Sequence, residues 1–468
     1  MRYMSTRGAA PALAFDEVLL AGLARDGGLY VPESWPHFDA AAIAALAGKS
    51  YPQVVAAVTF PFVAGAIDRA DFDRLVGEAY AGFDHAAVAP LVQLDGSTWL
   101  MELFHGPTLS FKDYALQLLG RLLDHVLRKR GQRVTIVGAT SGDTGSAAIE
   151  AVQGRSAIDV FMLHPKGRVS DVQRRQMTSV LARNVFNIAV EGNFDDCQDL
   201  VKAMFNDLAF RDEMHLTAVN SINFARIMAQ IAYYFWAAVA LGAPHRAVRF
   251  CVPTGNFGNV YSGYAAREMG LPIEHLQIGS NRNDILTRFF ESGAMKIEGV
   301  TPSLSPSMDI QVSSNFERLL FDLYGRRGPA VAETMAGFRD KGVYEVGGNA
   351  LAAARKLFSA YRLSDEQTLE MIAETRRRTG LVVDPHSAIG IAGPWRHGGK
   401  STAPTVVLAT AHPAKFPDAV EKAIGLRPAL PAALADLASR EERCAALPND
   451  AAALQAYMRR HASLKGAA

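Results

Sequence analysis

The feature that most limits the fold of this 468-residue chain is a repeated alternation of short apolar segments with amphipathic ones. From about residue 91, stretches rich in Val, Ile and Leu each precede a stretch with helical periodicity. Strands that alternate with helices predict an α/β fold, with parallel sheets flanked by helices. The segments predicted to be strands are 134–139, 158–163, 185–190, 215–219, 248–254, 275–280 and 405–410. In such sheets, ligands bind beyond the carboxyl ends of the strands.

The ends of the chain have a different character. Residues 1–90 look mostly helical, with a turn-rich interruption at 26–36, and residues 426–468 are Ala-rich and look like a helical tail. We therefore expect an N-terminal domain over 1–90, a region of alternating strands and helices over 91–425 and a tail over 426–468.

Composition excludes several classes of function. Lys and Arg total 48 and Asp and Glu total 47, so the net charge of +1 gives no general basis for binding nucleic acid or anionic membranes. The longest apolar run, 231–241, is shorter than the roughly 20 residues of a membrane-spanning helix. The N-terminus lacks the apolar core of a signal peptide. Three separated cysteines indicate reduced thiols, and hence the cytoplasm.

One lysine occupies an unusual position. In "FHGPTLSFKDYALQLL", a Gly-Pro loop precedes an apolar-periodic stretch, with Ser110 as the expected N-cap and Lys112 in the first helical turn. The helix N-terminus disfavours a cation there and favours a neutral amine, which could act as a base or form an imine. The alternative is a lysine that extends into water.

Two loops between predicted strands and helices are suited to phosphate. "GATSGDTGSAA" (138–148) combines glycines with three hydroxyl side chains near a helix start, and it matches neither a Walker A loop nor GxGxxG. The alternative is a helix capped by Asp143 or Thr144. "VPTGNFGNVYSGY" (252–264) offers backbone donors without Lys or Arg, and the alternative is a tight turn.

A third segment, "NSINFARIMAQ", places Arg226 early in a long apolar helix. A guanidinium near a strand end is a good phosphate ligand, whereas the alternative is an interdomain salt bridge. The histidines have no metal-binding spacing and no GxSxG is present, so neither a metal site nor a serine hydrolase is expected.

Taken in order along the chain, these motifs resemble the threonine synthase family. The segments that carry the resemblance are "STRG", "DGGLYVPE", "ELFHGPTLSFKDYA", "ATSGDTGSAA", "PTGNFGN", "SMDIQVSSNFERLLF", "DPHSAIG" and "TAHPAKF". The resemblance implies pyridoxal 5'-phosphate as cofactor and the fold type II architecture of tryptophan-synthase-β-like enzymes. In that architecture, residues 91–425 would form a catalytic region of two α/β subdomains that binds the cofactor. It also implies O-phospho-L-homoserine as substrate, converted with water to L-threonine and phosphate. A monomer or a homodimer is expected.

The resemblance also implies residue roles. Lys112 would bind the cofactor covalently and move protons, and Thr410 would bond the pyridine nitrogen. The expected ligands of the cofactor phosphate are Gly255, Asn256, Phe257, Gly258 and Asn259. The expected ligands of the substrate are Thr140, Ser141, Thr144, Asn220, Ser221 and Arg226. Asp143 is expected beside the cofactor, where several relatives in this fold have Asn; an ionised Asp can accept a hydrogen bond but cannot donate one.

Two other functions compete with this interpretation. A phospho-lyase or dehydratase of the same fold would need the same lysine and loops, but it would release a 2-oxo acid instead of threonine. A nicotinamide-dependent oxidoreductase would need a GxGxxG turn followed by an acidic residue, and this pair is not found.

Overall fold

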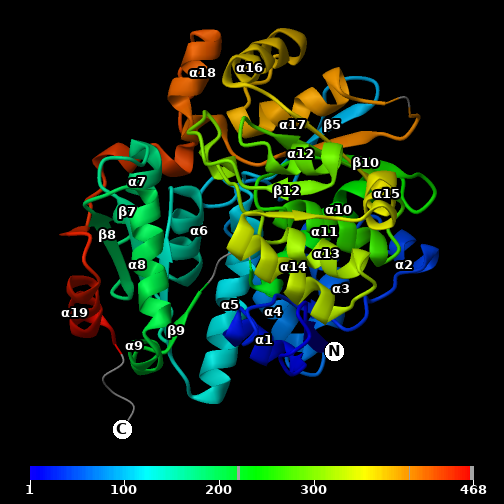
Figure 1. The fold of residues 1–468 in the computed structure, drawn as a ribbon. Helices are drawn as coiled ribbons and strands as arrows, with labels where there is room; N and C mark the ends of the chain where they lie inside the picture. Colours follow the sequence, from blue (N-terminus) through cyan, green and yellow to red (C-terminus); the bar gives the residue numbers. More distant parts are fainter. Residues whose placement is uncertain (219–221, 400, 464–468) are drawn as a thin grey trace. The chain divides into compact units, whose positions relative to one another are not determined.

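The computed structural model describes residues 1–218, 222–399 and 401–463, which fall into two compact units (Figure 1). The larger unit contains residues 1–111 and 221–428, and the smaller unit contains residues 112–220 and 429–468. Each unit is therefore built from two separate stretches of the chain. The chain passes from the larger to the smaller unit between Phe111 and Lys112.

The larger unit is organised around a six-stranded sheet with the order β14-β11-β10-β15-β5-β4. All neighbours pair in parallel except β4 and β5. The strands are β4 (Leu91–Gln93), β5 (Thr98–Glu102), β10 (Val248–Pro253), β11 (Ile273–Ser280), β14 (Phe358–Arg362) and β15 (Thr405–Ala409). Adjacent residues of β10 point to opposite faces. Phe250 contacts Tyr234 on one face, whereas Cys251 contacts Tyr361 on the other.

Helices cover both faces of this sheet. On one face lie α10 (Phe224–Ala240) and α11 (Gly258–Glu268), and on the other lies α17 (Pro385–Arg396). The other helices are α1 (Phe15–Ala21), α2 (Ala40–Ala44), α3 (Tyr51–Val63), α4 (Arg69–Tyr80), α12 (Ile285–Ser292), α13 (Phe316–Leu323), α14 (Gly328–Lys341), α15 (Gly348–Leu357), α16 (Asp365–Thr379) and α18 (Pro417–Ile424). Small sheets join β1 (Arg2–Ser5), β2 (Leu13–Ala14) and β3 (Tyr30–Pro32), and β12 (Ala294–Lys296) and β13 (Val343–Glu345).

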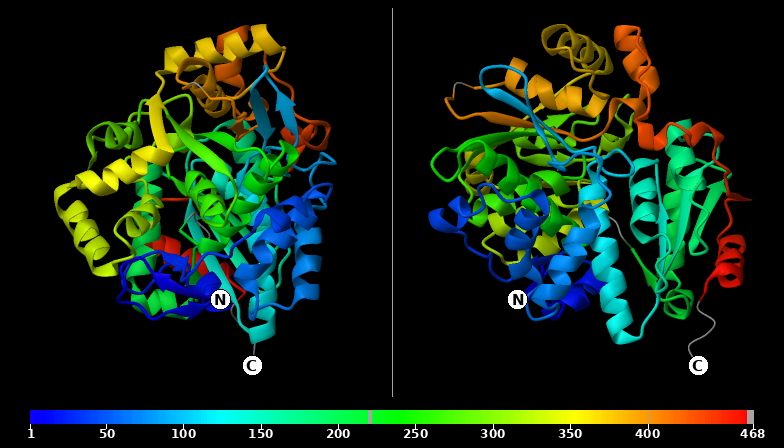
Figure 2. Two further views of the ribbon diagram at one scale, coloured as in Figure 1. Left: turned by 90° about the vertical axis from the view of Figure 1, so that its right-hand side faces the viewer. Right: turned by 180° about the vertical axis from the view of Figure 1, so that it is seen from behind.

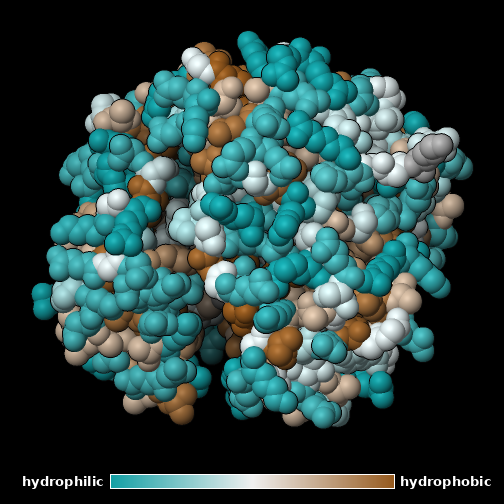
Figure 3. Space-filling model, turned by 45° about the horizontal axis from the view of Figure 1, so that its top comes forward, coloured by the Kyte–Doolittle hydropathy of each residue, from teal (hydrophilic) through white to brown (hydrophobic). Residues whose placement is uncertain are grey.

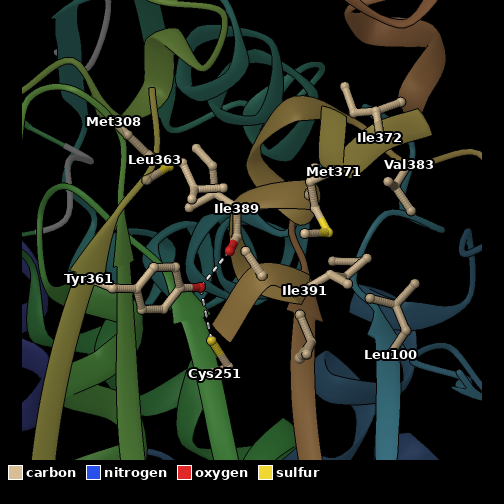
Figure 4. Packing of buried hydrophobic residues seen from close by; sticks show 14 residues of the cluster. Leu100, Cys251, Met308, Tyr361, Leu363, Met371, Ile372, Val383, Ile389 and Ile391 are labelled. Carbon is tan, nitrogen blue, oxygen red and sulfur yellow. Dashed lines mark hydrogen bonds between the residues drawn. The ribbon is translucent and has the colours of Figure 1, made fainter. Parts of the chain in front are cut away.

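An apolar cluster fixes α16 and α17 against the sheet (Figure 4). Ile389 and Ile391 of α17 and Met371 of α16 are buried in it with Leu100 of β5. The hydroxyl of Tyr361 lies 3.4 Å from the Cys251 sulfur and donates to the Ile389 carbonyl. Because this cluster is closely packed, β10 and β15 form a rigid support for the loops that follow them.

The smaller unit contains a fully parallel sheet with the order β16-β8-β7-β6-β9. The strands are β6 (Val134–Ala139), β7 (Ile158–Pro165), β8 (Val185–Val190), β9 (Leu216–Thr217) and β16 (Ala445–Leu447). The helices are α5 (Lys112–Arg130), α6 (Asp143–Val152), α7 (Asp171–Thr178), α8 (Phe194–Asn206), α9 (Leu208–Glu213) and α19 (Ala451–His461). Tyr457 of α19 contacts Phe161 of β7, and α19 lies beside this sheet (Figure 2).

The predicted fold class is confirmed, because each unit has a parallel sheet with helices. Seven predicted strands correspond to β6, β7, β8, β9, β10, β11 and β15. The C-terminal segment differs from the expected helical tail, since its residues 445–447 form β16 beside β8. The domain boundaries at residues 90 and 425 stay predictions.

The polarity of the surface can be followed on one face of the molecule (Figure 3). On the face drawn in Figure 3, hydrophilic residues predominate and hydrophobic ones lie in small groups. Among the described residues, no helix is long and apolar enough to cross a membrane, and no group of His, Cys, Asp and Glu side chains is arranged to hold a metal ion.

Candidate active site

Lys112 lies in the first turn of a helix, as predicted; it is the first residue of α5, and it does not extend into water. Its side chain is buried, with the residue 7% exposed, and Nζ donates to Asp143 Oδ2 over 3.1 Å. The carboxylate favours the ammonium form of the lysine, whereas the helix N-terminus favours the neutral amine. The two influences oppose each other at one nitrogen atom.

The expectation that Ser110 caps this helix is wrong. Because α5 begins at Lys112, Phe111 occupies the capping position, and the Ser110 hydroxyl has no hydrogen-bond partner among the described residues. The backbone explains the difference: Ser110 pairs with Ala411 in a β-bridge, and the Phe111 amide donates to the Thr410 carbonyl over 2.9 Å. Ser110 is thus held in an extended conformation, too early to cap.

Asp143, the first residue of α6, is held from its other side by Gln173. Gln173 Nε2 donates to Asp143 Oδ1 over 2.8 Å, so each carboxylate oxygen has a donor. Gly142 makes room for this contact: its φ is 135°, and a Cβ there would lie 2.5 Å from the Gln173 side chain. Sequence reasoning missed Gln173, because only the tertiary fold brings α7 against the start of α6.

The free amides at the start of α6 are bonded by a residue that was not expected to cap this helix. Neither Asp143 nor Thr144 caps α6. Instead, the Thr140 hydroxyl accepts from the amides of Gly142 and Gly145, each over 2.9 Å. Ser141 and Thr144 are half-buried in the same loop. The substrate contacts of Thr140, Ser141 and Thr144 stay predictions.

The second loop predicted to bind phosphate, within residues 252–264, lies in the larger unit between β10 and α11. It contains a strained residue, Phe257, in the left-handed region with φ at 60°. The Gly255 carbonyl accepts from the Ser313 hydroxyl over 2.7 Å. The Asn256 side chain accepts from the Ser314 hydroxyl over 2.7 Å, and its carbonyl accepts from Asn315 Nδ2 over 3.1 Å. The segment 313–315 therefore binds the acceptors of this loop.

The hydrogen bonding of the Asn259 side chain indicates whether this loop can bind an anion. The hydroxyls of Tyr233 and Tyr234 donate to its Oδ1 over 2.5 and 3.0 Å, which fixes the orientation of the amide. Its Nδ2 is buried and has no hydrogen-bond partner among the described residues. A buried donor without an acceptor carries a cost that an anionic oxygen would remove. Together with the start of α11, this fits a phosphate group.

Thr410 lies beside this loop in the sheet. It directly follows β15, the parallel neighbour of β10, so Thr410 and the 255–259 loop lie at the same edge of the sheet. Thr410 is buried, and its carbonyl accepts from Phe111. Nearby in sequence, the Lys415 ammonium donates to the Thr108 carbonyl over 2.6 Å and thereby fixes the loop before Phe111.

Arg226 lies in the first turn of α10, which Asn223 caps by accepting from the Ala225 amide. Arg226 is 4% exposed, and burial lowers the pKa of its guanidinium to about 10. It therefore remains a cation at neutral pH. Asn220 and Ser221, the other residues predicted in this segment, lie outside the described residues.

Comparisons with known proteins agree along the chain. The family models described as "Threonine synthase N terminus", "Pyridoxal-phosphate dependent enzyme" and "Threonine synthase, C-terminal" match residues 2–80, 83–336 and 387–458. The chain is 59% identical over 462 residues to a threonine synthase of Pseudomonas aeruginosa, with 98% of each chain covered.

Two solved structures are also similar to this chain. The structure of pyridoxal-phosphate-bound threonine synthase from Brucella melitensis has a TM-score of 0.97 and 56% identity, with 99% of this chain and 100% of that chain covered. Threonine synthase from yeast has a TM-score of 0.94 and 37% identity, with 98% of both covered. The predicted fold type is thereby confirmed.

Proposed function

The chain belongs to the threonine synthase family of pyridoxal-phosphate enzymes, and we propose that it converts O-phospho-L-homoserine and water to L-threonine and phosphate. It is a pyridoxal-phosphate-dependent lyase. The observation that best supports the proposed reaction is the buried pair of Lys112 and Asp143 at the starts of two helices. A lysine that must both give and take protons needs an environment in which neither form is strongly preferred.

The bound cofactor supplies an electron sink for carbanions next to the amino-acid nitrogen. In this chain, Lys112 would bind it covalently, Gly255, Asn256, Phe257, Gly258 and Asn259 would hold its phosphate, and Thr410 would bond its ring nitrogen. The buried Asn259 amide and the backbone N–H groups at the start of α11 are the donors that fit this role. Asp143 lies beside Lys112, where it orients the amine.

Lys112 carries the protons in this proposal. The amine takes a proton from Cα of the substrate and, once it has released that proton, takes one from Cβ. When phosphate has left from Cγ, a proton is added at Cγ; water then adds its hydroxyl at Cβ and gives up a proton. The three protons removed from Cα, Cβ and water are thus balanced by one added at Cγ, one returned to Cα and one bound by the departing phosphate. Asp143 stabilises the ammonium form between these steps, while the first turn of α5 keeps the neutral amine accessible.

The substrate phosphate would be held by Thr140, Ser141, Thr144, Asn220, Ser221 and Arg226. Since this phosphate is also the leaving group, a cation that binds it can stabilise the charge that develops as the bond to Cγ breaks. Arg226 is the cation suited to this role, because its guanidinium can contact two oxygens at once.

We also propose the compartment in which the protein acts and its oligomeric state. All three cysteines are free thiols, two of them buried, which supports a reducing compartment such as the cytoplasm. We propose either a monomer or a homodimer, acting on a small-molecule substrate.

The test is to incubate the pyridoxal-phosphate-loaded enzyme with O-phospho-L-homoserine and to quantify phosphate, threonine and 2-oxobutyrate together. Equal amounts of phosphate and threonine are expected. Lys112→Ala should fold but lose both products and the visible absorbance of lysine-bound cofactor, whereas the exposed Lys202→Ala should keep them. Phosphate with 2-oxobutyrate would indicate an eliminating phospho-lyase, and a Lys112→Ala variant with normal absorbance would refute the role of the lysine.

A further inference from the structure

Arg318, in the first turn of α13, is a fully buried cation that joins three distant parts of the larger unit. It is 0% exposed, and burial lowers the pKa of its guanidinium to about 10. Nε donates to the Tyr30 carbonyl over 3.1 Å, and one terminal nitrogen donates to the Ile222 carbonyl over 2.5 Å. The other terminal nitrogen donates to the side-chain oxygen of Asn315. These bonds are charge-assisted and therefore strong.

Asn315 passes this constraint on to the loop between β10 and α11. Its Nδ2 and its backbone amide both donate to the Asn256 carbonyl, over 3.1 and 3.3 Å. Arg318 holds the oxygen end of the Asn315 amide group, so the nitrogen end is left to face the loop. The orientation of Asn315, and with it one anchor of the loop, is thus determined by Arg318.

The anchored carbonyls determine where the loop amides point. In a trans peptide the C=O and the following N–H point in opposite directions. Because the Gly255 and Asn256 carbonyls face segment 313–315, the amides of Asn256 and Phe257 face away from it. The loop therefore presents a row of N–H donors on its other side, as a phosphate group requires.

The bond to Ile222 extends the same effect to a second segment. Ile222 directly precedes Asn223, the N-cap of α10, and Arg226 lies in the first turn of that helix. One guanidinium thus holds both the loop assigned to the cofactor and the start of the helix assigned to the substrate. A lysine has the charge but not the planar fork, so it could not bond three acceptors in these directions.

We propose that Arg318 is a positioning residue that fixes the 255–259 loop and the start of α10 for binding the cofactor phosphate and the substrate phosphate. It touches neither ligand and acts through Asn315 and Ile222. The proposal rests on the proposed function, which assigns these two segments to pyridoxal phosphate and to O-phospho-L-homoserine.

Arg326 provides a matched control. It also anchors the N-terminal region, donating to the carbonyls of Pro32 and Glu33 over 3.1 and 2.6 Å and to Asp322 over 2.8 Å. None of its hydrogen bonds among the described residues reaches segment 313–315 or Ile222. A variant at Arg326 therefore removes hydrogen bonds to the same N-terminal segment without removing one that anchors the loop.

The experiment compares the holoenzymes of Arg318→Lys, Asn315→Ala and Arg326→Met with the wild type. It measures the dissociation constant of pyridoxal phosphate by dialysis and absorbance, the phosphorus-NMR resonance of the bound phosphate, and the KM for O-phospho-L-homoserine. Loss of a charge-assisted bond predicts cofactor binding about tenfold weaker in Arg318→Lys and Asn315→Ala, with a resonance moved towards that of free cofactor. KM should rise in Arg318→Lys and much less in Asn315→Ala, because Asn315→Ala keeps the bond from Arg318 to the Ile222 carbonyl.

Arg326→Met should keep the wild-type dissociation constant and resonance while melting at a lower temperature. Wild-type cofactor binding in both Arg318→Lys and Asn315→Ala would overturn the proposal, as would an equal loss in Arg326→Met. If Arg318→Lys fails to fold, Asn315→Ala alone decides. Failure of the wild-type enzyme to form threonine would instead overturn the proposed function and leave the cofactor-binding results valid.

Discussion

Asp143 is the residue whose charge matters most to the proposed chemistry. It lies 3.1 Å from the Lys112 nitrogen, and Gln173 satisfies its second oxygen. A carboxylate at this distance favours the ammonium form of the lysine, while an amide of the same shape would not. The pH range in which the lysine can accept a proton therefore depends on Asp143.

Asp143→Asn tests this dependence. Without the carboxylate, the neutral amine is populated at lower pH, so the acidic limb of the pH–rate profile should move to lower pH. The control is Asp171→Asn, which changes an exposed carboxylate in the same unit and should leave the limb in place. A limb that stays put or moves up in Asp143→Asn would show that the carboxylate does not act on the lysine.

Arg226 can be tested by separating binding from chemistry. Removing one charged hydrogen-bonding group predicts a KM for O-phospho-L-homoserine about tenfold to a hundredfold higher in Arg226→Ala, with a smaller change in kcat. Arg226→Lys should recover part of the loss, because it restores the charge but not the two-pronged contact. Unchanged KM in a normally folded Arg226→Ala would remove this residue from the site.

Residue-level prediction from the sequence succeeded where the signal is local. The position of Lys112 in a first helical turn follows from its neighbours alone. Ser110 failed as a cap because its backbone pairs with Ala411, which is distant in sequence. The contacts of Gln173 and Arg318 were not predictable for the same reason, since each acts on a segment that only the fold brings close.

At the scale of elements, the loop from β10 to α11 is shaped by the backbone that packs on it. A Cβ at Gly255 would lie 3.0 Å from the Cα of Met308, and Gly255 cannot move away without disturbing the hydrogen bond that its carbonyl accepts from Ser313. The glycine at this position thus serves close approach between two backbones.

Gly255→Ala should therefore displace the loop and weaken pyridoxal-phosphate binding by about tenfold, since a misplaced donor loses a hydrogen bond of about 1 kcal/mol or more. Gly337→Ala, within α14, meets nothing within 4 Å and should raise stability by about 0.5–1 kcal/mol. Titration with the cofactor and thermal unfolding measure the two effects. Unchanged cofactor affinity in Gly255→Ala would show that the loop tolerates the added methyl group.

The alternation of elements was predictable for the centres of the sheets but not for all of their strands. Strands β4, β5, β14 and β16 were missed, and they are only three to five residues long. Their partners in the sheet, rather than their own sequences, identify them as strands.

For the whole molecule, one buried and two half-buried histidines predict how stability depends on pH. Burial lowers the pKa values of His164, His275 and His412 to about 4 each, below the ordinary value of 6.5. Between these values the unfolded chain binds more protons than the folded chain, so stability rises with pH across this window. Above it, the contribution is complete.

The melting temperature should accordingly fall as the pH is lowered from about 6.5 to about 4. His275→Asn should weaken this dependence, because it removes one of the three titrating groups while keeping a polar side chain beside Ser359. A melting temperature that is constant across the window, or an unchanged slope in His275→Asn, would contradict this explanation.

The sheet of the smaller unit is completed by β16, which comes from the last stretch of the chain. On the ribosome, β8 therefore emerges long before its outer neighbour, and the apolar segment "VFNIAV" stays open on one side while residues 221–428 are made. At about 5–20 residues per second this takes roughly 10–40 s. An uncovered apolar strand is a template for pairing with other chains. The nascent protein thus passes through an interval of exposure to misassembly that ends only when β16 has been made and can pair with β8.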